Sequence, residues 1–128
     1  MDATFCDTKI FQLDEFYFLN ETNPSSYCSF LTKHFAEPNK VPPKNRFYIS
    51  RFDVLKKKPQ EYDNIIEQNG GIDIGILGVG TDGHIAFCEP GTPFDTKTHI
   101  RTLSANMLKH CKKNLPAPLQ LRRIKKGI

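Results

Sequence analysis

The chain has 128 residues, a formal net charge of +4 and a hydrophobic fraction of 38%, which allow a single domain with one hydrophobic core. Its four cysteines are widely spaced and include no CxxC pair, so the composition argues against a structural zinc site. Its residues show no long apolar segment, and we expect no signal peptide. We therefore expect free thiols, a cytoplasmic location and no contact with a membrane.

The first predicted elements are a short strand at residues 9–13 and a helix that begins at Pro24. Asn23 can cap this helix, Pro24 suits its first position, and apolar residues recur at helical spacing over residues 27–35. Asp14 follows the strand directly. An acid just beyond a strand end is a candidate site residue, although a turn-forming aspartate is the commoner explanation.

The middle of the chain continues this alternation of strands and helices. Residues 37–46 contain three prolines, which predict an extended connection. Residues 47–50 predict a short strand, and residues 59–69 predict a second helix that ends at Gly70. Residues 72–79 are almost entirely apolar, as expected of a strand buried on both faces. The order predicts an α/β fold with a mostly parallel sheet and flanking helices.

The last part of the chain is basic. Residues 98–104 alternate well enough for a strand, and residues 105–113 predict a short helix. Asp95 is the last acidic residue, and residues 115–128 form a basic tail of uncertain order with little periodic signal. Its basic residues are not interleaved with aromatic ones, so a solvated end is favoured over contact with nucleic acid.

A glycine-rich loop follows the apolar segment. Gly78, Gly80 and Gly83 spell G-x-G-x-x-G, which raises the possibility of a dinucleotide-binding turn. Two features argue against a nicotinamide or flavin cofactor. Pro90 and Pro93 leave room for little more than one helical turn, and no acid follows at the distance expected for a ribose contact.

The ionisable groups of this loop suit acid/base chemistry. Asp82 and His84 are two residues apart, so in an extended segment they point to the same side. A carboxylate beside an imidazole fixes its tautomer and stabilises its protonated form, which gives a general acid/base near neutral pH. Glu89 adds a second carboxylate if the loop folds back, and the glycines allow the backbone to approach a substrate closely.

Two segments resemble one enzyme family. The glucosamine-6-phosphate deaminase (isomerase) family has the pattern G-x-G-x-D-G-H-I-A-F-N-E-P, which is similar to the segment GVGTDGHIAFCEPGTPFDTKTHIRTL. The same family has M-D-E-Y and P-x-S-Y further upstream, which are similar to the segment LDEFYFLNETNPSSYCSF. The resemblance covers roughly residues 9–104. It implies a single partial domain over residues 1–128, Rossmann-like, with the family's first and last strands lying outside the chain. Sheet edges left unpaired in this way favour oligomerisation.

The resemblance also implies an activity that needs neither a metal nor a cofactor. Glucosamine 6-phosphate would become fructose 6-phosphate and ammonia, with His84 opening the sugar ring, Asp82 and Glu89 orienting His84, and Asp14 removing the C2 proton. Gly80 and Gly83 would lie against the substrate. Lys113 would replace a family arginine that contacts the phosphate.

Two alternatives stay open. The related 6-phosphogluconolactonases also have a G-x-D-G-H loop, although the run from Ile85 to Pro90 is closer to the deaminases. A non-catalytic fragment that binds a partner or a sugar phosphate is the other alternative. Cys88 stands where the deaminase pattern has asparagine, and residues 99–102 only partly match the effector contacts of the family.

Overall fold

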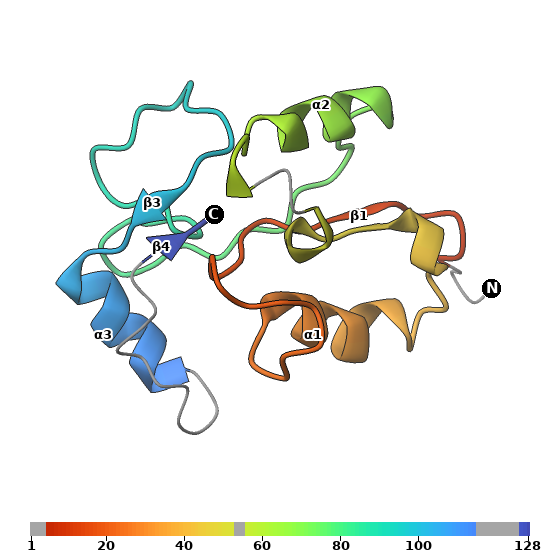
Figure 1. The fold of residues 1–128 in the computed structure, drawn as a ribbon, viewed down its shortest axis with the longest axis horizontal. Coiled ribbons are helices and arrows are strands. Elements are labelled where there is room, and N and C mark those ends of the chain that lie inside the picture. The colour runs from red at the N-terminus through yellow and green to blue at the C-terminus, as the bar shows by residue number, and fades with distance from the viewer. Residues whose placement is uncertain (1–4, 53–55, 115–125) are drawn as a thin grey trace.

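The computed structural model describes residues 5–52, 56–114 and 126–128, with the backbone alone for residues 112–114. A π-helical turn at Thr32–Ala36 continues the first helix, and 3-10 turns at Pro43–Asn45 and Ile49–Arg51 flank the second strand. The helices and strands in chain order are β1 (Ile10–Phe11), α1 (Tyr27–Leu31), β2 (Arg46–Phe47), α2 (Glu61–Gln68), β3 (Arg101–Thr102), α3 (Ala105–Asn114) and β4 (Lys126–Gly127) (Figure 1).

One pair of strands confirms the parallel arrangement expected from the sequence. β1 and β2 run parallel, with Ile10 opposite Arg46 and Phe11 opposite Phe47, and the two phenylalanine rings stack 4.8 Å apart. In the view of Figure 1, α2 lies above this pair and α1 below it. A parallel pair between helices is the core arrangement of α/β folds.

The second pair of strands is antiparallel. β3 pairs with β4, with Arg101 opposite Gly127. Gly127 also bridges to Phe16, and Glu15 and Ile128 exchange two backbone hydrogen bonds of 2.8 and 2.9 Å. Residues 126–128 of the predicted basic tail therefore pair with the segment that follows β1, while residues 115–125 lie outside the described residues.

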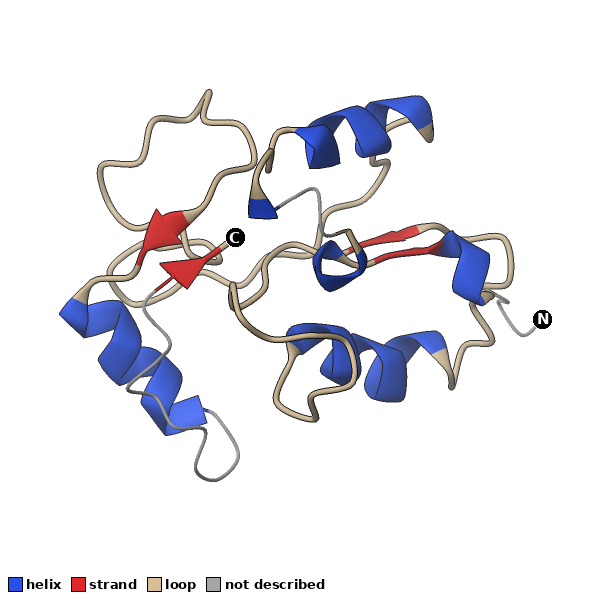
Figure 2. Ribbon diagram, viewed as in Figure 1, coloured by secondary structure: helices blue, strands red, loops and turns tan. Residues whose placement is uncertain are grey.

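The prediction of a buried strand at residues 72–79 is wrong for this structure. The segment is drawn as a loop in Figure 2 and forms only an isolated bridge between Val79 and Ile85. Its apolar side chains are open to solvent, with exposed fractions of 81% for Ile74 and 90% for Ile76. A strand that is apolar on both faces needs neighbours on both edges and helices over both faces, and the described residues do not supply them here.

The helices agree with the periodicity of the sequence, with one correction at a cap. α2 and α3 begin and end close to their predicted bounds. α1 is capped by Ser26, whose side chain accepts a hydrogen bond from the Ser29 amide, and not by Asn23. Asn23 instead accepts a hydrogen bond from the Ser25 amide within the preceding turn. Among the described residues, no helix has the length and apolar character needed to cross a membrane.

Two apolar clusters hold these elements together. Tyr62 of α2 belongs to one of them, and its hydroxyl lies 2.7 Å from the Phe47 carbonyl oxygen and 2.9 Å from that of Gln12. This cluster is made of Ile49, Tyr62 and Ile128. The other cluster joins the segment after β1, the glycine-rich loop and α3, and is made of Phe16, Leu19, Phe87, Leu103, Met107 and Cys111. It therefore fixes the three segments that contain the predicted site residues.

Candidate active site

Asp14 is a partly buried carboxyl group in the turn that follows β1. Burial raises its pKa from 3.8 to about 7, and the neighbouring charge of Glu15 adds to the shift. Desolvation disfavours the charged form of a carboxyl group, so Asp14 changes its protonation state close to neutral pH. This is the range in which a carboxyl group serves both as a base and as an acid.

Glu15 fixes the backbone around Asp14. Glu15 is only 2% exposed, and both of its carboxylate oxygens accept hydrogen bonds. Oε1 accepts hydrogen bonds from the Phe16 amide at 2.9 Å and the Tyr27 amide at 3.2 Å, and Oε2 accepts one from the Cys28 amide at 3.0 Å. The last two amides belong to the first turn of α1, where a carboxylate is stabilised. Glu15 therefore joins the Asp14 turn to the start of α1.

Gln12 holds the same turn from the other side. Its Nε2 donates to the Asp14 carbonyl oxygen and to Glu15 Oε2, both at 2.9 Å. Its Oε1 accepts a hydrogen bond from the Ile49 amide, also at 2.9 Å. Gln12 is 2% exposed, so these bonds form away from water and fix the Asp14 turn to the segment after β2.

The structure brings Asp82 and His84 together, although in a turn and not in the extended segment that was expected. Asp82 Oδ1 lies 2.6 Å from His84 Nδ1 and also accepts the His84 backbone amide at 3.2 Å. The hydrogen bond to the imidazole lowers the pKa of the Asp82 carboxyl. Because the carboxylate accepts at Nδ1, this nitrogen holds a proton, and Nε2 is the nitrogen left to exchange a proton with a ligand.

The glycines of the loop allow this pair to form. The Gly80 amide donates to the His84 carbonyl oxygen at 2.8 Å, and a Cβ placed on Gly80 would overlap the His84 ring. Gly83 has φ of +86°, the left-handed region that favours glycine. The two glycines fit the turn around His84, whereas their predicted contact with a substrate stays a prediction.

Glu89 lies on the other side of this loop. Its carboxylate accepts hydrogen bonds from Ser104 at the start of α3 and lies 3.3 Å from Nε of Arg101 in β3. These contacts join the end of the glycine-rich loop to the β3–α3 junction. They differ from the prediction that Glu89 orients His84, whose ring contacts Asp82 and His110.

α3 packs against both the segment that follows Asp14 and the glycine-rich loop. Burial, and then the charges of Asp14 and Glu89, raise the pKa of the Cys111 thiol to about 11. The apolar cluster that contains Phe16, Phe87 and Cys111 packs the segments around Asp14 and Glu89 against this helix. The neighbouring residue, His110, contacts the His84 ring at a centroid distance of 5.1 Å. Lys113 is in the same helix, and its side chain lies outside the described residues.

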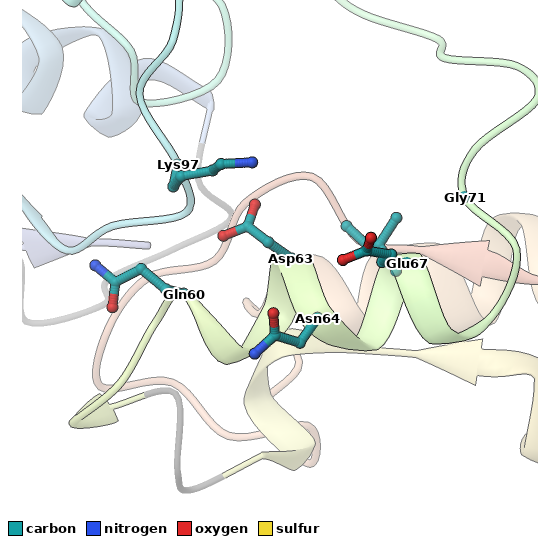
Figure 3. A pocket seen from close by; sticks show the side chains of 7 residues that line it. Gln60, Asp63, Asn64, Glu67, Gly71 and Lys97 are labelled. Carbon is teal, nitrogen blue, oxygen red and sulfur yellow. The ribbon is translucent and has the colours of Figure 1, made fainter.

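A cavity of about 480 Å³ lies apart from these residues, beside α2 (Figure 3). Asp63 at its wall accepts hydrogen bonds from the amide and the hydroxyl of Thr98, each at 3.1 Å. None of the predicted site residues lines this cavity. Its lining residues are Gln60, Asp63, Asn64, Ile66, Glu67, Gly71 and Lys97. Among the described side chains, no three His, Cys, Asp or Glu residues are grouped as metal ligands.

Residues 3–115 match the family model described as glucosamine-6-phosphate isomerases/6-phosphogluconolactonase. The chain belongs to this family. It is 36% identical over 104 residues to a glucosamine-6-phosphate deaminase of Bacillus pumilus, a match that covers 80% of this chain and 43% of the relative. It is 42% identical over 111 residues to the deaminase of Lactobacillus acidophilus, covering 84% of this chain and 44% of the relative.

A solved structure agrees with the sequence relatives. The chain resembles a monomeric glucosamine-6-phosphate deaminase with a TM-score of 0.84 and 28% identity, over 97% of this chain and 51% of that one. The chain thus has part of the Rossmann-like α/β fold of this isomerase and lactonase family. It spans less than half the length of the curated relatives that it matches.

The family match includes every residue predicted for the site, but three residues of the site were not predicted. Gln12 and Glu15 are buried polar residues whose partners are up to 37 residues away in the sequence. The one sequence signal for Glu15 is an acid directly beside Asp14 and ahead of an aromatic run. His110 had no signal, because it lies among lysines on a short predicted helix.

Proposed function

We propose that this chain performs the acid/base steps of a glucosamine-6-phosphate deaminase, converting glucosamine 6-phosphate to fructose 6-phosphate and ammonia without a metal or cofactor. The observation that supports this most directly is the Asp82–His84 pair, 2.6 Å apart, on a loop that packs against α3 together with the segment that follows Asp14. The named deaminase relatives supply the substrate class. A sugar phosphate of this kind makes the cytoplasm the proposed place of action.

His84 acts first in the proposed sequence. Its Nδ1 proton is held by Asp82, so Nε2 moves the proton between the C1 hydroxyl and the ring oxygen as the sugar ring opens. Glu89 supports this step at a distance, because its contacts with Ser104 and Arg101 hold the end of the loop against β3 and α3. General acid/base catalysis of this kind typically contributes about 10²- to 10⁴-fold in rate.

Asp14 acts second. As a carboxylate it removes the C2 proton of the open aldehyde. The C2–H electron pair forms the enolamine double bond between C1 and C2, while the C1=O π pair moves onto the C1 oxygen, which takes up a proton. Reprotonation at C1 gives an iminium group at C2, which water hydrolyses to the ketone and ammonia. A pKa of about 7 lets the same group accept and return this proton near neutral pH.

Lys113 and the phosphate complete the proposal. We assign Lys113 to the phosphate because it lies one turn of α3 beyond His110, the residue beside His84. The relatives are more than twice as long as the matched region, so the affinity of this chain for the substrate is part of what the experiment measures.

The test is ammonia release from glucosamine 6-phosphate by the purified chain, read by a coupled glutamate dehydrogenase assay. His84→Ala should lower the rate at least about 10²-fold. The control is His34→Ala, since His34 is exposed beside Phe30 on the turn that continues α1. Ammonia release that persists in both His84→Ala and Asp14→Asn would contradict the assigned roles.

Hydrolysis of 6-phosphogluconolactone in place of ammonia release would favour the lactonase branch of the family. Sugar-phosphate-dependent thermal stabilisation without turnover would favour a binding fragment.

A further inference from the structure

Three groups surround the ring of His84. Asp82 holds Nδ1 at 2.6 Å, the backbone of Gly80 lies so close that a Cβ there would overlap the ring, and the His110 ring of α3 forms a T-shaped pair with it. The His84 and His110 centroids are 5.1 Å apart and their planes make an angle of 74°. This edge-to-face geometry is one that aromatic pairs favour.

The contact from α3 differs in kind from the other two. Asp82 and Gly80 belong to the same loop as His84, and the Asp82 side chain is 51% exposed, so both would move with the loop. α3 is instead fixed to the core by Met107 and Cys111, each 4% exposed. His110 is therefore a contact that connects the His84 ring to a helix packed on the core.

We propose that His110 is a positioning residue for His84. Its ring sets the plane of the imidazole, while Asp82 sets the tautomer and Gly80 leaves space for the ring. This inference rests on the proposed function for its kinetic part, since it assigns His84 the ring-opening step. Its structural part, the orientation of the His84 ring by α3, stands apart from turnover.

A positioning role of this kind has a distinct kinetic signature. His110→Ala removes the edge-to-face contact and should lower kcat by about two- to tenfold, the range that such aromatic pairs correspond to, with KM within about twofold. His110→Phe retains an aromatic edge and should restore kcat. Lys109→Ala, at the exposed neighbouring position of α3, is the control and should leave both constants unchanged.

Nuclear magnetic resonance provides a readout that does not depend on turnover. In the wild-type chain the ring protons of His84 lie beside the His110 ring, so His110→Ala should shift them and His110→Phe should bring them close to their wild-type positions. Circular dichroism melts of each variant show whether the fold is retained. If the wild-type chain releases no ammonia, the proposed function fails, while the resonance shifts still test the contact between the two rings.

Two results would overturn the inference. One is a His110→Ala variant whose His84 ring resonances and kcat both match the wild type. The other is a His110→Phe variant that folds normally and yet loses as much activity as His110→Ala, because a contact between rings cannot explain a requirement for the histidine nitrogens.

Discussion

Replacing Asp14 with asparagine should stabilise the chain at alkaline pH and leave its stability almost unchanged in acid. Burial raises the pKa of this carboxyl from 3.8 to about 7, so the folded state keeps a proton that the unfolded state loses as pH rises above 3.8. Folding is then disfavoured progressively between pH 4 and 7. Three pK units correspond to about 4 kcal/mol at pH 8, an upper limit since Asp14 retains some contact with solvent.

The assay is urea unfolding followed by far-ultraviolet circular dichroism at pH 4 and pH 8. We expect Asp14→Asn to gain about 2–4 kcal/mol over the wild type at pH 8 relative to the same comparison at pH 4. Taking the difference between the two pH values cancels any constant effect of the asparagine. Asp95→Asn, at an exposed position in the loop before β3, is the matched control. An Asp14→Asn effect that is equal at both pH values would refute the claim that this carboxyl is desolvated.

Three further predictions follow from the loop, the Asp14 turn and the exposed segment. Gly80→Ala should displace the His84 ring from Asp82, because the new Cβ overlaps that ring, and should lower ammonia release at least about tenfold. Glu15→Gln should lower the free energy of unfolding by about 1–3 kcal/mol, measured in urea, because its amide group cannot accept all the hydrogen bonds of the buried carboxylate. Ile76→Lys should change the free energy of unfolding by less than about 0.5 kcal/mol, since Ile76 is 90% exposed, and should reduce self-association in sedimentation velocity.

Two of these changes have a control in the same chain. Gly78→Ala should be tolerated, because a Cβ there meets no atom within 4 Å. Glu37→Gln changes an exposed carboxylate and should leave stability unchanged. Equal losses in the Gly80 and Gly78 variants, or in the Glu15 and Glu37 variants, would contradict the account of the loop or of the buried carboxylate. A large destabilisation by Ile76→Lys would mean that the segment is buried in solution.

Local sequence predicts those parts of the fold whose partners are local. The periodicity of residues 59–69 and 105–113 predicts α2 and α3 well, because an amphipathic helix is defined by its own spacing. The start of α1 was predicted less well. Asn23 and Ser26 are both good caps, and the choice depends on Glu15, which binds the amides of Tyr27 and Cys28 from twelve or more residues away.

The segment at residues 72–79 shows the opposite limit. Its composition indicates burial on both faces, yet burial also needs partners that no local pattern contains. In the described residues Ile74 and Ile76 face solvent. An apolar composition therefore shows that a strand here would need to be covered on both faces. In the structure the described residues do not cover this segment.

The candidate site also contains some contacts that local sequence predicts and others that it does not. The i, i+2 spacing of Asp82 and His84 predicts their contact, and the position of Asp14 beyond β1 predicts a carboxyl group at a strand end. Glu15 and His110 depend on tertiary packing, which brings residues 15 and 28, or 84 and 110, side by side. No spacing rule predicts such contacts.

The most direct test of the proposed chemistry is the fate of the C2 proton. Glucosamine 6-phosphate labelled with deuterium at C2 is incubated with the wild-type chain and with Asp14→Asn, and the label is followed by nuclear magnetic resonance. We expect the wild type to remove the label from C2 as ammonia appears, and Asp14→Asn to leave it in place. Retention of the label by the wild type, or its removal at an equal rate by Asp14→Asn, would contradict the assignment of Asp14 as the base.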